Sequence, residues 1–440
     1  MIKVDFINRW KSAKLFTIFI ENKEKNSSFS NDHALQFYFG SIIPKKKYEL
    51  TDELIDIYKK YTIVRPCDIV INGLNLNYDF VTQRIGLVTE QGIITSAYIS
   101  LRCRQNFNAL YYCYLFKVLD AQKLFHGMGT GIRLTLSYNE LKYLELPVPP
   151  RDEQEQIVRF LDWKVSEINK LINIRRKEIK ELEALKRSVI NHTVTQGLNP
   201  NVSKKYSGVK WLGDIPAHWS IVKLRKILHP ISIKNRPDLP LLSVVREQGV
   251  ILRNVNDKET NHNFIPDDLS SYKVVKKAQF AMNKMKAWQG SYGVSNYTGI
   301  VSPAYFIFDI DFNNLEYFHY AIRSKVYVNF FAQASDGIRV GQWDLDIHKM
   351  KEIPFIVPPE AEQIAIVDYI NNVLPKYEIA IKKLAVKINL LEEVKTRLIA
   401  DVVTGKIDVR GIKVPDYEFV AETADSDIDY NEDDEASEEN

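Results

Sequence analysis

Residues 149–158 read PPRDEQEQIV, and residues 358–367 read PPEAEQIAIV. In both stretches a Pro-Pro pair precedes Glu, Gln and a run of helix-forming residues. This order is typical of a helix start, because proline is tolerated in the first turn and carboxylates favour the positive end of the helix dipole. The two stretches lie 209 residues apart. They therefore predict two long helices at equivalent places in a duplicated chain.

The spacing of 209 residues holds from the first segment of the chain to the last. Residues at this spacing include Trp10 and Trp219, Leu15 and Leu224, Val194 and Val403, and Thr195 and Thr404. Between these anchors the register drifts by a few residues, as loop insertions would cause. One spacing kept over the whole length is hard to produce by chance, so we infer an internal duplication of one module.

Each module has a globular part and a helical part. In residues 85–102 and 292–310, β-branched and aromatic residues alternate with Gly, Asn and Ser, which predicts short strands. The expected fold class is α+β, with two similar globular domains separated by two long antiparallel coiled-coil helices and related by a pseudo-two-fold repeat. The expected segments are a first globular domain at 1–150, a helix at 151–197, a linker at 198–210, a second globular domain at 211–359, a helix at 360–404, and a C-terminal segment at 405–440.

Apolar residues recur at intervals of three and four in the predicted helices, which indicates a heptad seam. The seam of the second helix comprises Leu374, Tyr377, Ile381, Leu384, Ile388, Leu391, Lys395 and Leu398. The matching residues of the first helix are Val165, Ile168, Ile172, Arg175, Ile179, Leu182, Lys186 and Val189. Such a stripe needs a partner, and two helices of equal length can supply each other. Pro375 is expected to break or restart the second helix near Leu374.

The net charge of +3 hides an asymmetry along the chain. Residues 416–440 hold 12 acidic residues and no Lys or Arg, and they are predicted to be disordered. Without them, 59 Lys and Arg residues face 44 of the 56 Asp and Glu residues, a net charge of +15. A body this basic favours a polyanionic partner, although a basic surface that serves solubility explains the charge equally well. For the tail we favour solubility over mimicry of DNA.

Several classes of protein do not fit the sequence. There is no run of eighteen apolar residues, no secretory signal pattern, and no metal-ligand spacing among Cys67, Cys103 and Cys113, so we expect a reducing cytoplasm. Phosphate-binding and dinucleotide-binding glycine motifs are missing. The Pro-Pro pairs lack the preceding Asn or Asp with which amino-methyltransferases hold a flipped base. The sequence therefore predicts a chain without an active site, bound cofactor or metal of its own.

A family resemblance follows from the combination of motifs. WLGDIPAHWSIVKL (211–224) resembles the opening of a target-recognition domain in the specificity subunits of Type I restriction-modification systems. The two PP-x-x-EQ helix starts, and the helix ends VTQGLNPNV and VTGKIDVR, are similar to those of the same family. The likeness runs from about Trp10 to Arg410. The first module departs from the family because it lacks the W-L-G-x-I-P stretch before Trp10.

The resemblance implies a function for the whole chain. Each globular domain would read one half of a split double-stranded DNA site, and the helices would set the spacing and dock two modification subunits. Those subunits would hold S-adenosylmethionine and methylate adenine, and restriction subunits that use ATP and Mg would complete the nuclease. A helix over 151–193 would span ~65 Å, whereas half-sites read from one face of DNA lie ~34 Å apart or a multiple of that. The helices are therefore long enough for this role.

Candidate DNA contacts lie where the two globular parts differ most, at residues 72–84 and 283–292. Contacts to base edges need Arg, Lys, Asn or Gln, and lysines interleaved with aromatics suit phosphate and base contacts. The predicted contacts are Asn72, Asn75, Gln83 and Arg84 in the first part, and Lys284, Lys286, Trp288, Gln289 and Tyr292 in the second. A surface turn with a packing Trp is an equally good interpretation of the second stretch.

Arg133 and Arg339 lie in corresponding GIR turns of the two modules. Because they appear in both, we predict contacts to backbone phosphate rather than to one base, with a structural salt bridge as the alternative. Two other functions stay open for the chain as a whole. One is a self-contained DNA adenine methyltransferase, and the other is a coiled-coil protein scaffold.

Overall fold

The computed structural model describes residues 10–38, 40–46, 49–76, 83–131, 134–254, 265–266, 268–336 and 343–421. The chain divides into two compact units. Unit 1 comprises Met1–Arg176 and Ala385–Asn440, and unit 2 comprises Lys177–Leu384. Among the helices built from these described residues, none is long and apolar enough to cross a membrane.

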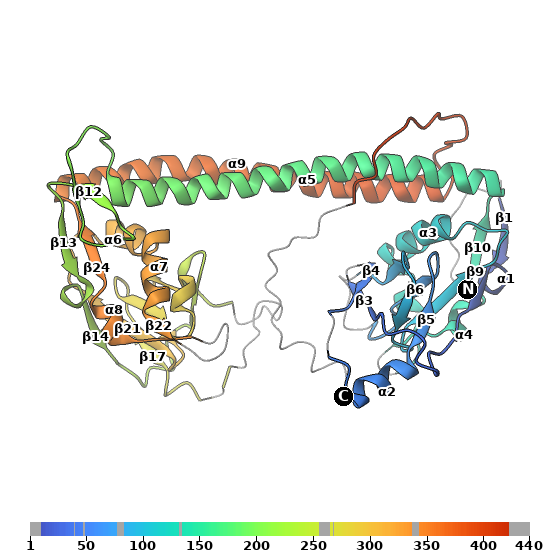
Figure 1. Cartoon of the computed structure of the whole chain (residues 1–440), viewed down its shortest axis with the longest axis horizontal. Coiled ribbons are helices and arrows are strands. Elements are labelled where there is room, and N and C mark those ends of the chain that lie inside the picture. Colours follow the sequence, from blue (N-terminus) through green and yellow to red (C-terminus); the bar gives the residue numbers. More distant parts are fainter. Residues whose placement is uncertain are drawn as a thin grey trace. The chain divides into compact units, whose positions relative to one another are not determined.

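Two long helices run through both units (Figure 1). Helix α5 spans Arg151–Gln196 and α9 spans Glu360–Val403. Because the division falls inside both helices, each unit contains the first half of one helix and the second half of the other. The predicted α+β class with long paired helices is confirmed, but the helices do not form domains separate from the globular parts.

The globular part of unit 1 is built on a four-stranded sheet in the order β2-β9-β6-β7. Its elements are β1 (Lys11–Lys14), α1 (Leu15–Ile18), β2 (Phe19–Glu21), β3 (Leu35–Tyr38), β4 (Ser41–Pro44), α2 (Asp52–Lys60), β5 (Thr62–Val64), β6 (Ile69–Ile71), β7 (Ile85–Leu87), β8 (Gly92–Ile94), β9 (Ile99–Cys103), α3 (Ala109–Ala121), the 3-10 helix η1 (Phe125–Gly127), α4 (Tyr138–Leu141) and β10 (Glu145–Val148). Three strand pairs, β1-β10, β3-β4 and β5-β8, complete it.

Unit 2 repeats this plan with the sheet order β14-β21-β18-β19 and the pairs β13-β24, β15-β16 and β17-β20. Its elements are β11 (Lys204–Tyr206), β12 (Asp214–Pro216), β13 (Ser220–Lys223), η2 (Leu224–Lys226), β14 (Leu228–Ile231), β15 (Leu242–Val245), β16 (Gly249–Leu252), β17 (Lys273–Val275), β18 (Phe280–Asn283), η3 (Ala287–Gln289), β19 (Tyr292–Val294), β20 (Gly299–Val301), β21 (Tyr305–Ile310), α6 (Leu315–Ile322), α7 (Lys325–Gln333), β22 (Ser335–Asp336), β23 (Asp344–Leu345), α8 (Ile347–Lys351) and β24 (Pro354–Val357). The matching strand orders confirm the predicted duplication. One difference is that β11, inside the expected linker 198–210, pairs with β12.

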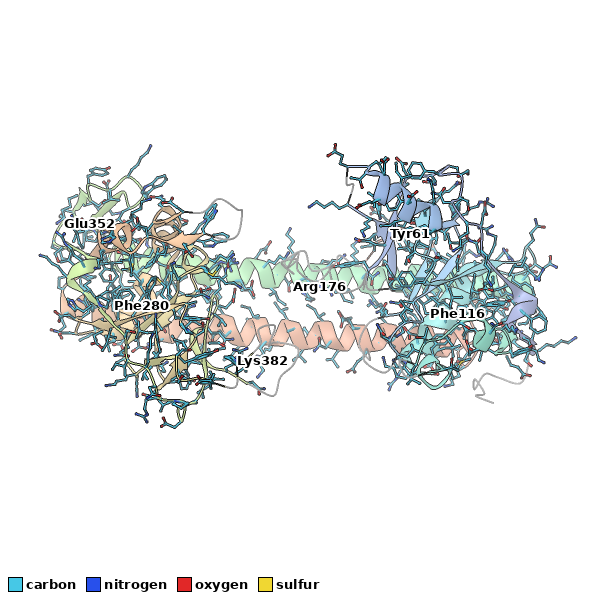
Figure 2. All side chains as sticks on the ribbon, turned by 90° about the horizontal axis from the view of Figure 1, so that it is seen from below. Tyr61, Phe116, Arg176, Phe280, Glu352 and Lys382 are labelled. Atoms are coloured by element: carbon cyan, nitrogen blue, oxygen red, sulfur yellow. The ribbon has the colours of Figure 1, made fainter. Side chains whose placement is uncertain are left out.

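Each unit has one main hydrophobic core that joins its sheet to the long helices. In unit 1 the core packs the sheet and α3 against the start of α5 and the end of α9, and Phe116 lies inside it (Figure 2). In unit 2 the core around Phe280 joins the sheet, α6 and α7 to the start of α9 and the end of α5. Each core thus contains the helix end of the other sequence repeat.

The repeated motif residues make the junctions between the globular parts and the helices. The indole nitrogen of Trp10 donates to Glu153 at 3.2 Å, and that of Trp219 donates to Glu362 at 2.9 Å. Tyr111 donates its hydroxyl hydrogen to the Val403 carbonyl in unit 1, at 3.0 Å. The Trp, Glu and Val positions of the repeat therefore have structural roles.

The two helices lie side by side in both views, with Arg176 on α5 and Lys382 on α9 labelled in Figure 2. Every residue of the two predicted seams is buried or partly buried. Ile172 is fully buried, and Leu374 and Ile388 are each 8% exposed. Ion pairs cross between the helices from Arg176 to Glu392 at 3.4 Å and from Lys186 to Glu378 at 2.6 Å.

Pro375 does not break α9, so that expectation was wrong. Its ring is on the exposed side of the helix. Leu374 is buried in the core of unit 2 and Tyr377 is partly buried, so side-chain packing around Pro375 offsets the hydrogen bond that proline cannot donate.

The C-terminal segment lies along α5 in unit 1. Gln156 donates to the carbonyls of Val409 and Ile412, at 3.0 and 2.7 Å. Farther along α5, Asn169 donates to the Val420 carbonyl at 3.1 Å. The segment is therefore docked as far as residue 421, so the predicted disorder was wrong for residues 416–421, and the rest of the predicted tail lies outside the described residues.

Loss of Gln154 should destabilise unit 1. Its buried amide accepts the Asn108 N–H at 2.8 Å and donates to the Pro149 carbonyl at 2.8 Å. Gln154→Ala leaves two enclosed backbone groups without this partner, so we expect a loss of about 1–3 kcal/mol in chemical denaturation. The control is Glu155→Ala, which removes an exposed pair with Arg151 and should cost under about 1 kcal/mol. Equal losses in both variants would contradict this role.

Unit 2 should lose stability on mild acidification through His319. Burial, with a smaller contribution from Arg323, lowers the pKa of His319 to about 4, and its Nδ1 accepts the Val294 N–H at 3.3 Å. Below pH 6.5, the ordinary pKa of histidine, His319 is protonated in the unfolded chain but stays neutral in the folded chain. The free energy of unfolding therefore falls as the pH drops from about 6.5 towards 4.

Between pH 7 and 5 the expected loss from this residue is about 1–2 kcal/mol. In denaturation at the two pH values, His319→Gln should show a smaller pH dependence than the parent chain by that amount. An unchanged pH dependence in the variant would rule out this assignment.

Candidate nucleic-acid interface

Two loops of unit 1 meet beside the end of β6. The Asn72 side chain accepts the Leu74 N–H at 3.1 Å, which turns the chain sharply after the strand. The Leu136 N–H donates to the Gly73 carbonyl at 2.8 Å and joins this loop to the loop that contains residues 130–135. A Cβ at Gly73 would lie 2.4 Å from the Leu136 oxygen, so the junction requires glycine.

The same construction recurs in unit 2 at the end of β18. The Asn283 side chain accepts the Met285 N–H at 3.0 Å, and the Leu345 N–H donates to the Lys284 carbonyl at 3.2 Å. The loop 283–291 is thereby joined to the loop between β22 and β23. We call the described residues of these paired loops the reading loops of each unit: 72–76, 83–84, 130–131 and 134–135 in unit 1, and 283–291, 335–336 and 343–345 in unit 2.

The structure brings most of the predicted contact residues onto these loops. Asn75 and Gln83 are exposed in unit 1, and Asn75 adopts a left-handed conformation with φ of 52°. Lys286 is exposed in unit 2, and Gln289 is partly exposed. Asn72 is partly buried and serves mainly as the turn residue.

Arg84 was predicted to contact DNA, but it is 2% exposed. The guanidinium of Arg84 donates to the carbonyl of Leu74 at 2.7 Å and to that of Asn72 at 3.2 Å, and the backbone N–H of Arg84 donates to the Asp120 carboxylate at 2.7 Å. Burial raises the pKa of Asp120, and the Arg84 N–H and charge oppose that rise. Arg84 therefore stabilises the conformation of the first reading loop through buried hydrogen bonds.

Tyr292 is the second correction, because it is fully buried. It begins β19 with its ring 4.3 Å from that of Phe331 and 5.7 Å from that of Phe280, centroid to centroid. Burial also raises its pKa. Its place in the sheet corresponds to that of Ile85 in unit 1, so the side chain belongs to the core.

Arg133 and Arg339 lie outside the described residues, but the bases of their loops are described. Thr130 and Thr135 exchange two backbone hydrogen bonds of 3.0 Å around the first loop. β22 pairs with β23 around the second. The phosphate contacts of Arg133 and Arg339 therefore stay a prediction.

Trp288 forms a pair with Trp343, which the sequence reasoning missed. Their ring centroids lie 5.1 Å apart at 46°, and both rings are partly exposed. The indole N–H of Trp288 donates to the Met285 carbonyl at 3.1 Å. Trp343 lies two residues before Leu345, the place that Leu134 takes before Leu136 in unit 1, and an aromatic residue at this place was the available signal.

Lys284 is engaged within unit 2, because its ammonium lies 2.6 Å from the Asp344 carboxylate. This ion pair joins the two reading loops beside the tryptophan pair. Lys286 is thus the more accessible of the two predicted lysines. In the part of the chain that the structure covers, no group of three or more His, Cys, Asp or Glu side chains could hold a metal ion.

The chain is similar to several known proteins. Residues 20–184 match the family described as the Type I restriction modification DNA specificity domain. The Type I restriction enzyme MjaVIII specificity subunit of Methanocaldococcus jannaschii is 24% identical over 223 residues, which cover 50% of this chain and 49% of that protein. The putative type I restriction enzyme MjaX specificity subunit of the same organism is 29% identical over 129 residues, covering 28% of this chain and 29% of that protein. The chain thus spans about half the length of the first relative, and less of the second.

A solved structure also shares the fold. It is described as the structural basis underlying complex assembly and conformational transition of the type I R-M system, and it aligns with a TM-score of 0.62 at 13% identity. The alignment covers 92% of this chain and 100% of that one. The family match concerns residues 20–184, and the solved structure shows a shared fold.

Proposed function

We propose that this chain is the DNA sequence-specificity subunit of a Type I restriction-modification complex, and that each unit reads one half of a bipartite double-stranded DNA site. The observation that carries the proposal is the pair of reading loops. Both units build them with the same Asn turn and the same backbone hydrogen bond between loops. The exposed side chains on the two pairs differ, so one scaffold presents two different surfaces.

The chemistry of the loops suits DNA. Lys286 is a phosphate contact, while Asn75, Gln83 and Gln289 reach base edges by donating and accepting hydrogen bonds. The excess of basic residues before residue 416 attracts the duplex at long range.

The long helices set the number of unread base pairs and dock two modification subunits. A row of apolar side chains on α9 is exposed, and Ile379, Val386, Leu390 and Val394 are each 51–55% exposed. Their spacing places them on one face of the helix, away from the seam. An exposed apolar row of this kind favours a protein partner.

The chain itself is the non-catalytic member of the complex and binds no cofactor. S-adenosylmethionine is held by the modification subunits, which methylate adenine, and ATP and Mg by the restriction subunits. The complex works in the cytoplasm.

Replacement of Trp288 tests the proposal. The chain is co-produced with its modification subunit, and methylated adenines are mapped across the host genome. We expect a split motif. Trp288→Ala should lower the free-energy difference between correct and incorrect bases in one half of the motif by about 1–3 kcal/mol, and it should leave the other half unchanged. The control is Tyr297→Ala, which removes an exposed ring of unit 2 outside the reading loops.

Three results would contradict the proposal. They are an unsplit motif, a change in both halves, or methyl transfer by the purified chain alone with S-adenosylmethionine. Binding of the chain to protein partners with no affinity for any duplex would instead favour the scaffold.

Lengthening both helices should change the gap and leave the half-sites intact. One heptad is inserted after Arg176 in α5 and one after Leu384 in α9, so that the seam stays in phase. Seven residues add about 10 Å of helix, which equals about three base pairs. Motif mapping should show the same half-sites with a gap longer by about three base pairs. An unchanged gap in an active complex would show that the helices do not set it.

A further inference from the structure

Unit 1 carries an exposed aromatic patch that its fold does not require. The patch consists of Phe16, which follows β1, and Tyr143, which follows α4. Phe16 is 40% exposed and Tyr143 is 58% exposed. Their ring centroids lie 6.2 Å apart in an edge-to-face arrangement.

Two lysines surround the patch. The ammonium of Lys14 lies 5.7 Å from the centroid of the Tyr143 ring, and that of Lys142 lies 5.2 Å from it. Lys142 also donates to Asn139 at 2.9 Å. Glu145 faces Lys14 across the β1-β10 pair, yet neither lysine forms an ion pair with a carboxylate of the described residues. The patch therefore combines apolar surface with positive charge.

The duplication supplies an internal comparison for these positions. The pairs β1-β10 and β13-β24 have the same register, and residues 16 and 143 correspond to Arg225 and Glu352. In unit 2 the Arg225 guanidinium lies 3.0 Å from the Glu352 carboxylate, and Lys223 contacts the same carboxylate. Glu352 is labelled at the surface of unit 2 in Figure 2. The same backbone is thus built with ion pairs in one unit and with exposed rings in the other.

We propose that the aromatic patch is a docking site in unit 1 for one of the two modification subunits, and that unit 2 lacks an equivalent. This inference rests on the proposed function. The complementary surface is an apolar side chain flanked by carboxylates, which would cover the rings and pair with Lys14 and Lys142. The DNA backbone would satisfy the lysines but would offer no apolar partner to Phe16. The two modification subunits are therefore held unequally, although the reading loops and helices are duplicated.

The test transplants the pair from unit 2 into unit 1. The double variant Phe16→Arg with Tyr143→Glu installs an ion pair that the same backbone already accommodates, so the chain should keep its melting temperature. The purified full-length chain is titrated with its purified modification subunit in calorimetry, with the parent chain measured alongside. We expect one binding event to weaken by at least about tenfold while the other stays unchanged. The control is Leu50→Ser, which removes an exposed apolar side chain of unit 1 before α2.

Other outcomes separate this inference from the proposed function. If the double variant binds both modification subunits as tightly as the parent chain, the docking site is wrong and the proposed function stands. A loss of DNA affinity measured without the modification subunit would assign the patch to DNA and overturn the inference. If the parent chain binds no modification subunit, both the inference and the proposed partner role fail.

Discussion

The structure depends on the exchange of helix ends between the two sequence repeats. Val403, from the second repeat, accepts the Tyr111 hydroxyl in unit 1, and Val194, from the first repeat, accepts the Tyr317 hydroxyl in unit 2 at 3.3 Å. All four residues are fully buried. Each core contains the start of one long helix and the end of the other. For this reason α5 and α9 run antiparallel. Within each unit, the seam residues of the two helices are buried or partly buried.

This exchange separates stability from recognition. The residues that repeat at 209 positions make the cores and junctions, as Trp10 with Glu153 and Trp219 with Glu362 demonstrate. The reading loops project from strands that these cores hold, and they need little from the sequence beyond an Asn turn and one backbone hydrogen bond. Their exposed side chains can therefore change without loss of the fold. Under the proposed function, this division would let the chain acquire new DNA sites.

The sequence predicted the duplication, the long helices and their seam, because each rests on a period that is visible along the chain. It also located the reading loops, since they are where the repeats diverge. It failed at Arg84 and Tyr292, whose residue types suit DNA contact. Their burial depends on Asp120 and Phe331, which are distant in sequence and reach them through the fold. The helix at Pro375 was misjudged for a similar reason, because a local rule was overridden by packing across the seam.

An internal duplication also serves as a comparison of a protein with itself. Where both units have the same residue, the fold is a sufficient explanation, as it is for Asn72 and Asn283. Where equivalent backbone positions have different side chains, the fold accommodates both, so the fold alone does not explain which residue each unit has. On the reading loops, Leu134 of unit 1 corresponds to Trp343 of unit 2. The proposed recognition of different bases by the two units accounts for this difference. Beside β1 and β13, Phe16 and Tyr143 of unit 1 correspond to Arg225 and Glu352 of unit 2. These positions lie outside the reading loops, so the proposed base recognition does not account for the difference. Exposed rings are costly to keep on a surface when an ion pair fits the same backbone, which argues for a partner that covers them in unit 1.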